Sequence, residues 1–228
     1  MAYAMHPAMR LGEVRLRIRD LDRSVRFYEE VVGLKTVVRG DREAELAAED
    51  GNTLVRLAQS AIAPAPRSAS GLYHYAILVP TRKALSLALR RLIASGIRIG
   101  QADHLVSEAL YISDPDGNGI ELYADRPRET WERDAAGNYR MASDPIDWDG
   151  LLGESAGSDP APLPAGTTIG HVHFHVGSLG RARQFYADAL GLDVVADLAG
   201  TMGALFLSAG GHHHHVGLNV WAGVGAPP

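Results

Sequence analysis

The chain has 228 residues, and 46% of them are hydrophobic, which is enough to bury one large core or two ordinary ones. Lysine and arginine total 22 against 27 aspartates and glutamates, so the net charge of -5 gives no general attraction for nucleic acid or an anionic membrane. The N-terminal segment lacks the apolar core of a signal peptide, and no apolar run approaches the ~20 residues of a membrane span. We therefore expect a cytoplasmic protein with a small-molecule partner and neither nucleic acid nor membrane. The sequence has no cysteine, which leaves His, Asp, Glu and Tyr for demanding chemistry.

An internal repeat organises the chain. The stretch LGEVRLRIRDLDRSVRFYEEVVGL, from Leu11, aligns with IGHVHFHVGSLGRARQFYADALGL, from Ile169, and the shared residues include Gly12 with Gly170. Each copy opens with alternating apolar residues, which predict a half-buried strand. Apolar residues at helical spacing then predict helices over 24–32 and 181–190, followed by further short strands such as GNTLVRLA and GALFLSA. The repeating unit is therefore βαβββ.

A weaker third copy lies between these two. GLYHYAILVP predicts a strand, TRKALSLALRRLIASG a helix, and EALYIS and GIELY flank the turn DPDGNG as a hairpin. The three modules span about 11–60, 71–125 and 168–222. The segment 126–167 is too polar and too rich in proline and glycine to form a fourth module, so we expect a long connector lying over a site.

The strands of each module must show alternate residues to the side away from the helix. In module 2 this parity selects His74 on the first strand, with Tyr111 and Glu121 on the hairpin. In module 3 the equivalent of His74 is His171. If modules 2 and 3 pack as a pair, two histidines and one carboxylate face one cleft. The corresponding positions of the other first strands are Glu13, Arg15 and Arg17 in module 1 and His173 and His175 in module 3.

Two imidazoles and one carboxylate on a single face form the facial triad that suits non-haem Fe(II), because three coordination positions stay open. The same ligands can also hold zinc, so the triad alone does not select the metal.

The run HLVSEALYISDPDGNGIELY, residues 104–123, resembles the signature of the type I extradiol ring-cleavage dioxygenases. These enzymes belong to the vicinal oxygen chelate superfamily, and the whole chain is similar to the catechol 2,3-dioxygenase group, including GLYHYAILVPTR and GHVHFHV. The resemblance implies an α+β fold in which paired βαβββ modules form half-barrel sheets around clefts, with helices outside. It also implies a catechol-like substrate, dioxygen as co-substrate, and Fe(II) as the metal, with Mn(II) as the alternative.

The resemblance also implies site residues. Their roles are metal ligation for His74, His171 and Glu121, and substrate contact for Tyr111. A histidine of the last module 3 strand acts as acid and base in the family, which points to His214 or His215. His104 is then a substrate-contacting or outer histidine.

Family members have four modules, whereas this sequence stops at WAGVGAPP, where the connector to a fourth would begin. We expect modules 1 and 2 within residues 1–125, the connector at 126–167 and module 3 at 168–228, with the fourth module absent. Either the sequence is a fragment, or module 1 finds a partner in a homo-oligomer or stays exposed.

Two other functions remain open from the sequence. A glyoxalase-like isomerase or lyase would add His214 or His215 as a fourth ligand and use nickel or zinc without oxygen. A binding protein of the bleomycin-resistance type would need the cleft but no metal.

Overall fold

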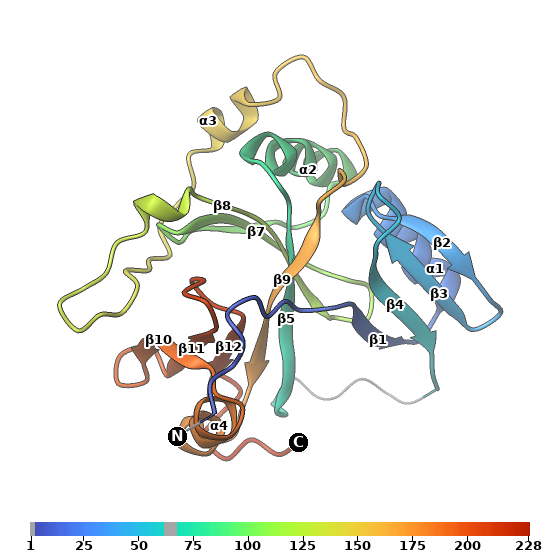
Figure 1. The fold of residues 1–228 in the computed structure, drawn as a ribbon. Helices are drawn as coiled ribbons and strands as arrows, with labels where there is room; N and C mark the ends of the chain where they lie inside the picture. The colour runs from blue at the N-terminus through green and yellow to red at the C-terminus, as the bar shows by residue number, and fades with distance from the viewer. Residues whose placement is uncertain (1–2, 62–67) are drawn as a thin grey trace.

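The computed structural model describes residues 3–61 and 68–228, which form two curled β-sheets of unequal size (Figure 1). The smaller sheet has the strand order β1-β4-β3-β2 and belongs to module 1. The larger has the order β10-β11-β12-β9-β5-β8-β7-β6 and joins modules 2 and 3. The strand bounds are β1 Val14–Ile18, β2 Lys35–Arg39, β3 Glu43–Ala47, β4 Thr53–Gln59, β5 Gly71–Leu78, β6 Gly100–Asp103, β7 Ser107–Ser113, β8 Gly119–Asp125, β9 Thr168–His175, β10 Asp193–Leu198, β11 Ala204–Ser208 and β12 Val216–Asn219.

The helices lie outside the sheets, so the predicted α+β fold with half-barrel sheets is confirmed (Figure 1). Their bounds are α1 Leu21–Phe27, α2 Arg82–Ser95, α3 Trp148–Gly153 and α4 Leu179–Arg183, with a short 3-10 helix at Arg128–Thr130. Both α1 and α4 continue into π-helical turns, Tyr28–Val32 and Gln184–Ala189. None of the described helices is long and apolar enough to cross a membrane.

The predicted starts of the helices at 24 and 181 were wrong by two to three residues. The side chains of Asp20 and Ser178 cap the first turns by accepting hydrogen bonds from the amides of Arg23 and Arg181. The prediction followed the apolar periodicity and overlooked these N-cap residues. In the first module the amides of Gly33 and Leu34 both donate to one carbonyl, which widens the last turn and lets Leu34 enter the core.

Antiparallel pairing of β5 with β9 joins modules 2 and 3 into one sheet, as the positions of the predicted ligands require. The two strands lie side by side at the centre of the molecule (Figure 1). On the other side β5 pairs in parallel with β8, and β8 pairs with β7 as the predicted hairpin. The middle of this sheet therefore brings strands of two modules side by side.

Modules 1 and 2 share one hydrophobic core. At its centre the Tyr75 hydroxyl donates to the Tyr28 hydroxyl at 3.0 Å, and the Tyr28 hydroxyl donates to Asp114 at 3.1 Å. The buried guanidinium of Arg91, from α2, donates to the carbonyl of Val32 at 3.1 Å. Polar contacts without access to water fix the two modules against each other.

Residues 3–10, here called the N-terminal strap, cross from module 1 to module 3 (Figure 1). The amide of Met5 donates to the carbonyl of Gly191 at 2.8 Å, and the side chains of Met5 and Met9 pack on the core of module 3. Gly191 has φ of 74°, and a Cβ there would lie 2.5 Å from the carbonyl oxygen of Tyr3. The close approach of the strap therefore requires glycine at this position.

The connector contains the short helix α3, which the sequence did not predict, and α3 packs on α2. The Ser155 and Ser86 hydroxyls are 2.6 Å apart, and Arg90 donates to the carbonyl of Leu152 at 2.8 Å. The face of the module 1 sheet that points away from α1 carries ion pairs, such as Arg56 with Glu13 at 2.6 Å. That face is therefore polar.

Candidate metal centre and active-site cavity

Neighbouring strands of the large sheet place the three proposed metal ligands. The pairing register aligns His171 of β9, Ala76 of β5, Glu121 of β8 and Tyr111 of β7 in one row. Directly paired residues point to the same side of a sheet, and so does His74, two residues before Ala76. Because the alanine side chain is short, the imidazole and the carboxylate on either side of it can meet above it.

The three ligand atoms converge on one point. The Nε2 atoms of His74 and His171 lie 3.1 Å and 3.0 Å from the same oxygen of Glu121, and all three side chains are buried. The Nε2 of His74 makes no hydrogen bond although it is buried. An orphaned imidazole nitrogen facing a shared carboxylate oxygen fits a divalent cation, which would take both nitrogens and the oxygen as ligands.

The charge states of these groups suit the same use. Burial alone would raise the pKa of Glu121, but the imidazoles of His171 and His74 outweigh it and hold the pKa well below its usual range. Burial lowers the pKa of His171 despite the neighbouring carboxylate. The site therefore offers a carboxylate and a neutral imidazole, the forms that coordinate metals.

Tyr111 and His104 form a hydrogen-bonded pair beside the ligands. The His104 Nδ1 lies 2.6 Å from the carbonyl oxygen of Ala142, and its Nε2 lies 2.6 Å from the Tyr111 hydroxyl. Since the carbonyl can only accept, Nδ1 is the donor, Nε2 is free to accept, and the Tyr111 hydroxyl donates to it. Burial, and then the charge of Glu121, raise the pKa of Tyr111 well above its usual range, so this side chain stays a phenol.

The structure separates the two histidines proposed as acid and base. His214 lines the cavity, and its ring centroid lies 4.0 Å from that of His171. Burial, and then His171, lower the pKa of His214 well below its usual range. His215 is not among the residues that line the cavity, and its Nδ1 lies 3.0 Å from the Ser208 hydroxyl. Of the two histidines, His214 is therefore the one that lines the cavity.

Sequence reasoning missed His213 and Asp125. The Nε2 of His213 lies 2.8 Å from Asp125, and its Nδ1 lies 2.7 Å from the Nδ1 of His214. Asp125, His212 and His213 also place one potential metal-ligand atom each within 4.8 Å of one another. The only available sequence signal was that Asp125 shares the strand parity of Glu121.

The ligands open into a cavity of about 410 Å³. Large apolar side chains also line this cavity, namely Met141 of the connector and Leu198, Met202, Phe206 and Trp221 of module 3. The connector, expected to lie over a site, contributes Met141, Ala142 and Ser143 to the lining of this cavity. His173 lines the cavity as expected, and its Nε2 accepts from the amide of Asn219 at 2.9 Å.

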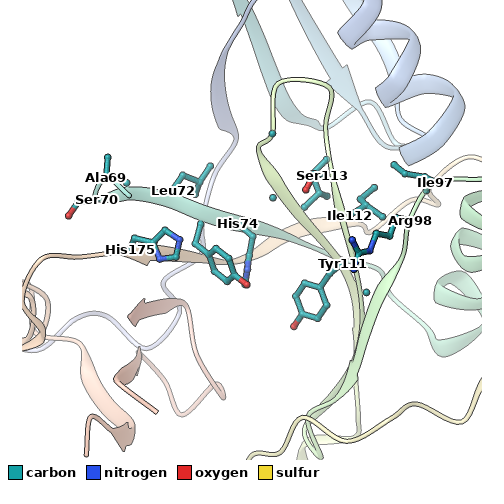
Figure 2. Close-up of a pocket in the computed structure, with 16 residues that line it drawn as sticks. Ala69, Ser70, Leu72, His74, Ile97, Arg98, Tyr111, Ile112, Ser113 and His175 are labelled. Carbon is teal, nitrogen blue, oxygen red and sulfur yellow. The ribbon is translucent and has the colours of Figure 1, made fainter. Parts of the chain in front are cut away.

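A second hollow, of about 650 Å³, continues from the cavity along β5 and β7. Figure 2 shows His74 and Tyr111 between its two halves, with His175 towards one end and Arg98 towards the other. The two hollows therefore adjoin each other at Tyr73, His74 and Tyr111.

A βαβββ repeat, a shared half-barrel sheet and a His-His-Glu cluster in its hollow define a class of protein. The family model of the Glyoxalase/Bleomycin resistance protein/Dioxygenase superfamily matches residues 10–122 and 168–222. The chain belongs to this superfamily, and the predicted membership is confirmed.

Among its relatives, the catechol-2,3-dioxygenase of Bacillus subtilis (strain 168) is 53% identical over 227 residues, which cover 99% of this chain and 79% of the relative. The prediction of an enzyme agrees with that name. A crystal structure from Bacillus subtilis subsp. subtilis str. 168 has a TM-score of 0.59 at 14% identity, covering 96% of this chain and 64% of that one. At this identity the likeness shows the fold alone. The Mn(II)-bound glyoxalase from Novosphingobium aromaticivorans has a TM-score of 0.42 at 20% identity, covering 91% of this chain and 60% of that one. The chain thus spans less than two thirds of both solved proteins.

Proposed function

We propose that the chain catalyses extradiol cleavage of a catechol-like ring with dioxygen, using Fe(II) bound by His74, Glu121 and His171. The observation that carries the proposal is the convergence of three buried ligand atoms at the wall of an apolar cavity. The name of the 53% identical relative supports the same reaction. Mn(II) is the alternative metal, since the three ligands suit either ion.

Different side chains would contact the substrate oxygens, move its protons and pack against its ring. The hydroxyl of Tyr111 donates its hydrogen to His104, so its oxygen is placed to accept a hydrogen bond from a substrate hydroxyl near Glu121. The neutral imidazole of His214 is placed to take a proton from a catechol hydroxyl and to return it later. The apolar wall contacts the ring and excludes water, which strengthens the polar interactions inside.

A ferrous ion, when bound, supplies adjacent coordination positions for both catechol oxygens and dioxygen, together with a route for electrons. Among residues 3–61 and 68–228 no fourth group joins the cluster, which would leave coordination positions open for these molecules.

The proposal is tested on protein purified without oxygen, loaded with Fe(II) and mixed with catechol in an oxygen electrode. We expect stoichiometric oxygen consumption and a yellow ring-cleavage product, both lost in Glu121→Ala and both kept in His6→Ala, whose imidazole is exposed. Isomerisation of a hemithioacetal without oxygen would instead identify a glyoxalase-like enzyme. Catechol binding without turnover under any metal would identify a binding protein.

A further inference from the structure

A buried chain of hydrogen bonds runs from Asp125 through His213 to His214. The Asp125 carboxylate lies 2.8 Å from the Nε2 of His213, and the two histidines approach through their Nδ1 atoms at 2.7 Å. We propose that Asp125 and His213 are positioning residues that hold His214 in the tautomer whose Nε2 is unprotonated. The inference rests on the proposed role of His214 as the base.

The order of donors follows from the chemistry of the three groups. An ionised carboxylate can only accept, so the Nε2 of His213 carries the hydrogen. A neutral imidazole with hydrogen on Nε2 has a lone pair on Nδ1, so the Nδ1 of His213 accepts. The Nδ1 of His214 must then donate, which leaves its Nε2 with a lone pair. That atom makes no hydrogen bond to a described residue, and the ring lines the cavity.

Burial makes this arrangement obligatory. His213 is fully buried and His214 is 5% exposed, so water cannot replace the partners. The rings of Tyr123 and Trp131 enclose His213, with centroids at 6.0 Å and 5.1 Å. Turning either imidazole over would leave a buried nitrogen without a partner, which costs roughly 1–3 kcal/mol.

Strand β8 holds the Asp125 end of the hydrogen-bonded chain in place. Glu121, Tyr123 and Asp125 alternate along β8 and therefore share one face of the sheet. The same strand thus presents a metal ligand, the ring that packs between His171 and His213, and the carboxylate that orients His213. The metal centre and the base are set relative to each other by a single rigid element.

The alternative explanation for this cluster is a second cation site formed by Asp125, His212 and His213. The His213 nitrogen that such an ion would need already donates to Asp125. Arg128, which donates to the carbonyl of Gly210, adds positive charge beside His212. The hydrogen-bonded chain therefore accounts for the cluster better than a metal does.

In the reaction, a catechol O–H bond breaks as an N–H bond forms at the Nε2 of His214. The positive charge is then shared through His213 with the Asp125 carboxylate. The arrangement parallels the way in which a carboxylate fixes the tautomer of a catalytic histidine in serine proteases.

The test uses the full chain labelled with 15N-histidine and freed of metal by chelation. Long-range 1H–15N correlation spectra report which nitrogen of each ring is protonated, and single histidine variants assign the ten rings. We expect hydrogen on Nε2 of His213 and on Nδ1 of His214, with both rings neutral. Hydrogen on Nε2 of His214 in the unaltered protein, or a doubly protonated His213, would overturn the inference.

The matched variants separate positioning from stability. Asp125→Leu keeps a similar shape without hydrogen-bonding atoms, and we expect it to lose the single-tautomer signal of His214 and to lower kcat by roughly 10²–10⁴-fold with little change in KM. Asp125→Glu should restore the signal, while His212→Gln should leave signal and kcat unchanged. If Asp125→Leu keeps the tautomer, or loses kcat only in proportion to lost metal or folded protein, the inference fails.

The tautomer signal does not depend on iron. Failure of the proposed function would appear as absence of ring cleavage in the unaltered protein, whatever the spectra show.

Discussion

Replacing Gly170 by alanine should damage the metal centre through a single steric contact. Gly170 precedes the proposed ligand His171, and a Cβ at this position would lie 1.8 Å from the Tyr123 hydroxyl oxygen and 2.7 Å from the nearest carbon of its ring. The backbone at Gly170 has no positive φ, so alanine is acceptable there except for this clash. The Tyr123 ring, 4.9 Å from the ring of His171, must move and release its support of that ligand.

The expected cost follows from the tight packing of this region. Tyr123 is fully buried, and forcing an extra carbon into such a core costs roughly 1–3 kcal/mol. For a chain of this size that corresponds to a fall of roughly 2–12 °C in Tm. Displacement of a group that orients a metal ligand should also weaken metal affinity by roughly 10–100-fold. Thermal unfolding followed by circular dichroism, and titration against a chromophoric chelator, measure the two effects.

The repeat provides a matched control at Gly12, which aligns with Gly170. No atom lies within 4 Å of the position that a Cβ would take at Gly12. Gly12→Ala should therefore leave Tm and metal affinity unchanged. The Tyr123 hydroxyl is buried without a hydrogen-bond partner, so Tyr123→Phe should be neutral or stabilising and should partly rescue Gly170→Ala. Unchanged Tm and metal affinity in Gly170→Ala would refute the reasoning.

Three further predictions concern the ligands, the phenol and acid stability. Stoichiometric iron binding should be abolished by each of the substitutions His74→Ala, His171→Ala and Glu121→Ala, because no other described group reaches the cluster. If elemental analysis finds that one of these variants retains iron, the substituted residue is not a ligand. Tyr111→Phe should keep its iron but lower kcat, because the lost hydroxyl acts on substrate oxygens, so loss of iron would instead make the phenol a ligand. Burial lowers the pKa of His215 from 6.5 to about 4, so the unfolded chain binds the proton first and the free energy of unfolding should fall as pH drops from 6.5 towards 4. Urea unfolding at several pH values should show a shallower fall in His215→Gln, and an equal slope would contradict the assignment.

The alternation of side chains was sufficient to predict the shared face of the ligands, because a strand has only two faces. It could not show that Ala76 lies between His171 and Glu121, since strand order and register depend on the whole sheet. The same holds for His213, which lies in a loop without periodicity, where contacts with Asp125 and Trp131 set the orientation of the ring. A run of four identical residues carries no signal that separates their roles.

The N-terminal strap was also beyond prediction, because residues 3–10 contact module 3 across nearly the whole length of the sequence. Neither composition nor spacing reports a contact between such distant segments.

The position of this strap has a consequence for folding during synthesis. Contacts between the ends of a long chain form slowly, because the intervening loop must first lose its conformational freedom. During synthesis the strap leaves the ribosome well before its docking surface on module 3 exists. The same delay applies to the His-His-Glu cluster, since β5 and β8 carry His74 and Glu121 but β9 must still supply His171. A nascent chain that ends before residue 168 therefore carries two residues of the His-His-Glu cluster without the third, so the cluster forms only after β9 has been synthesised.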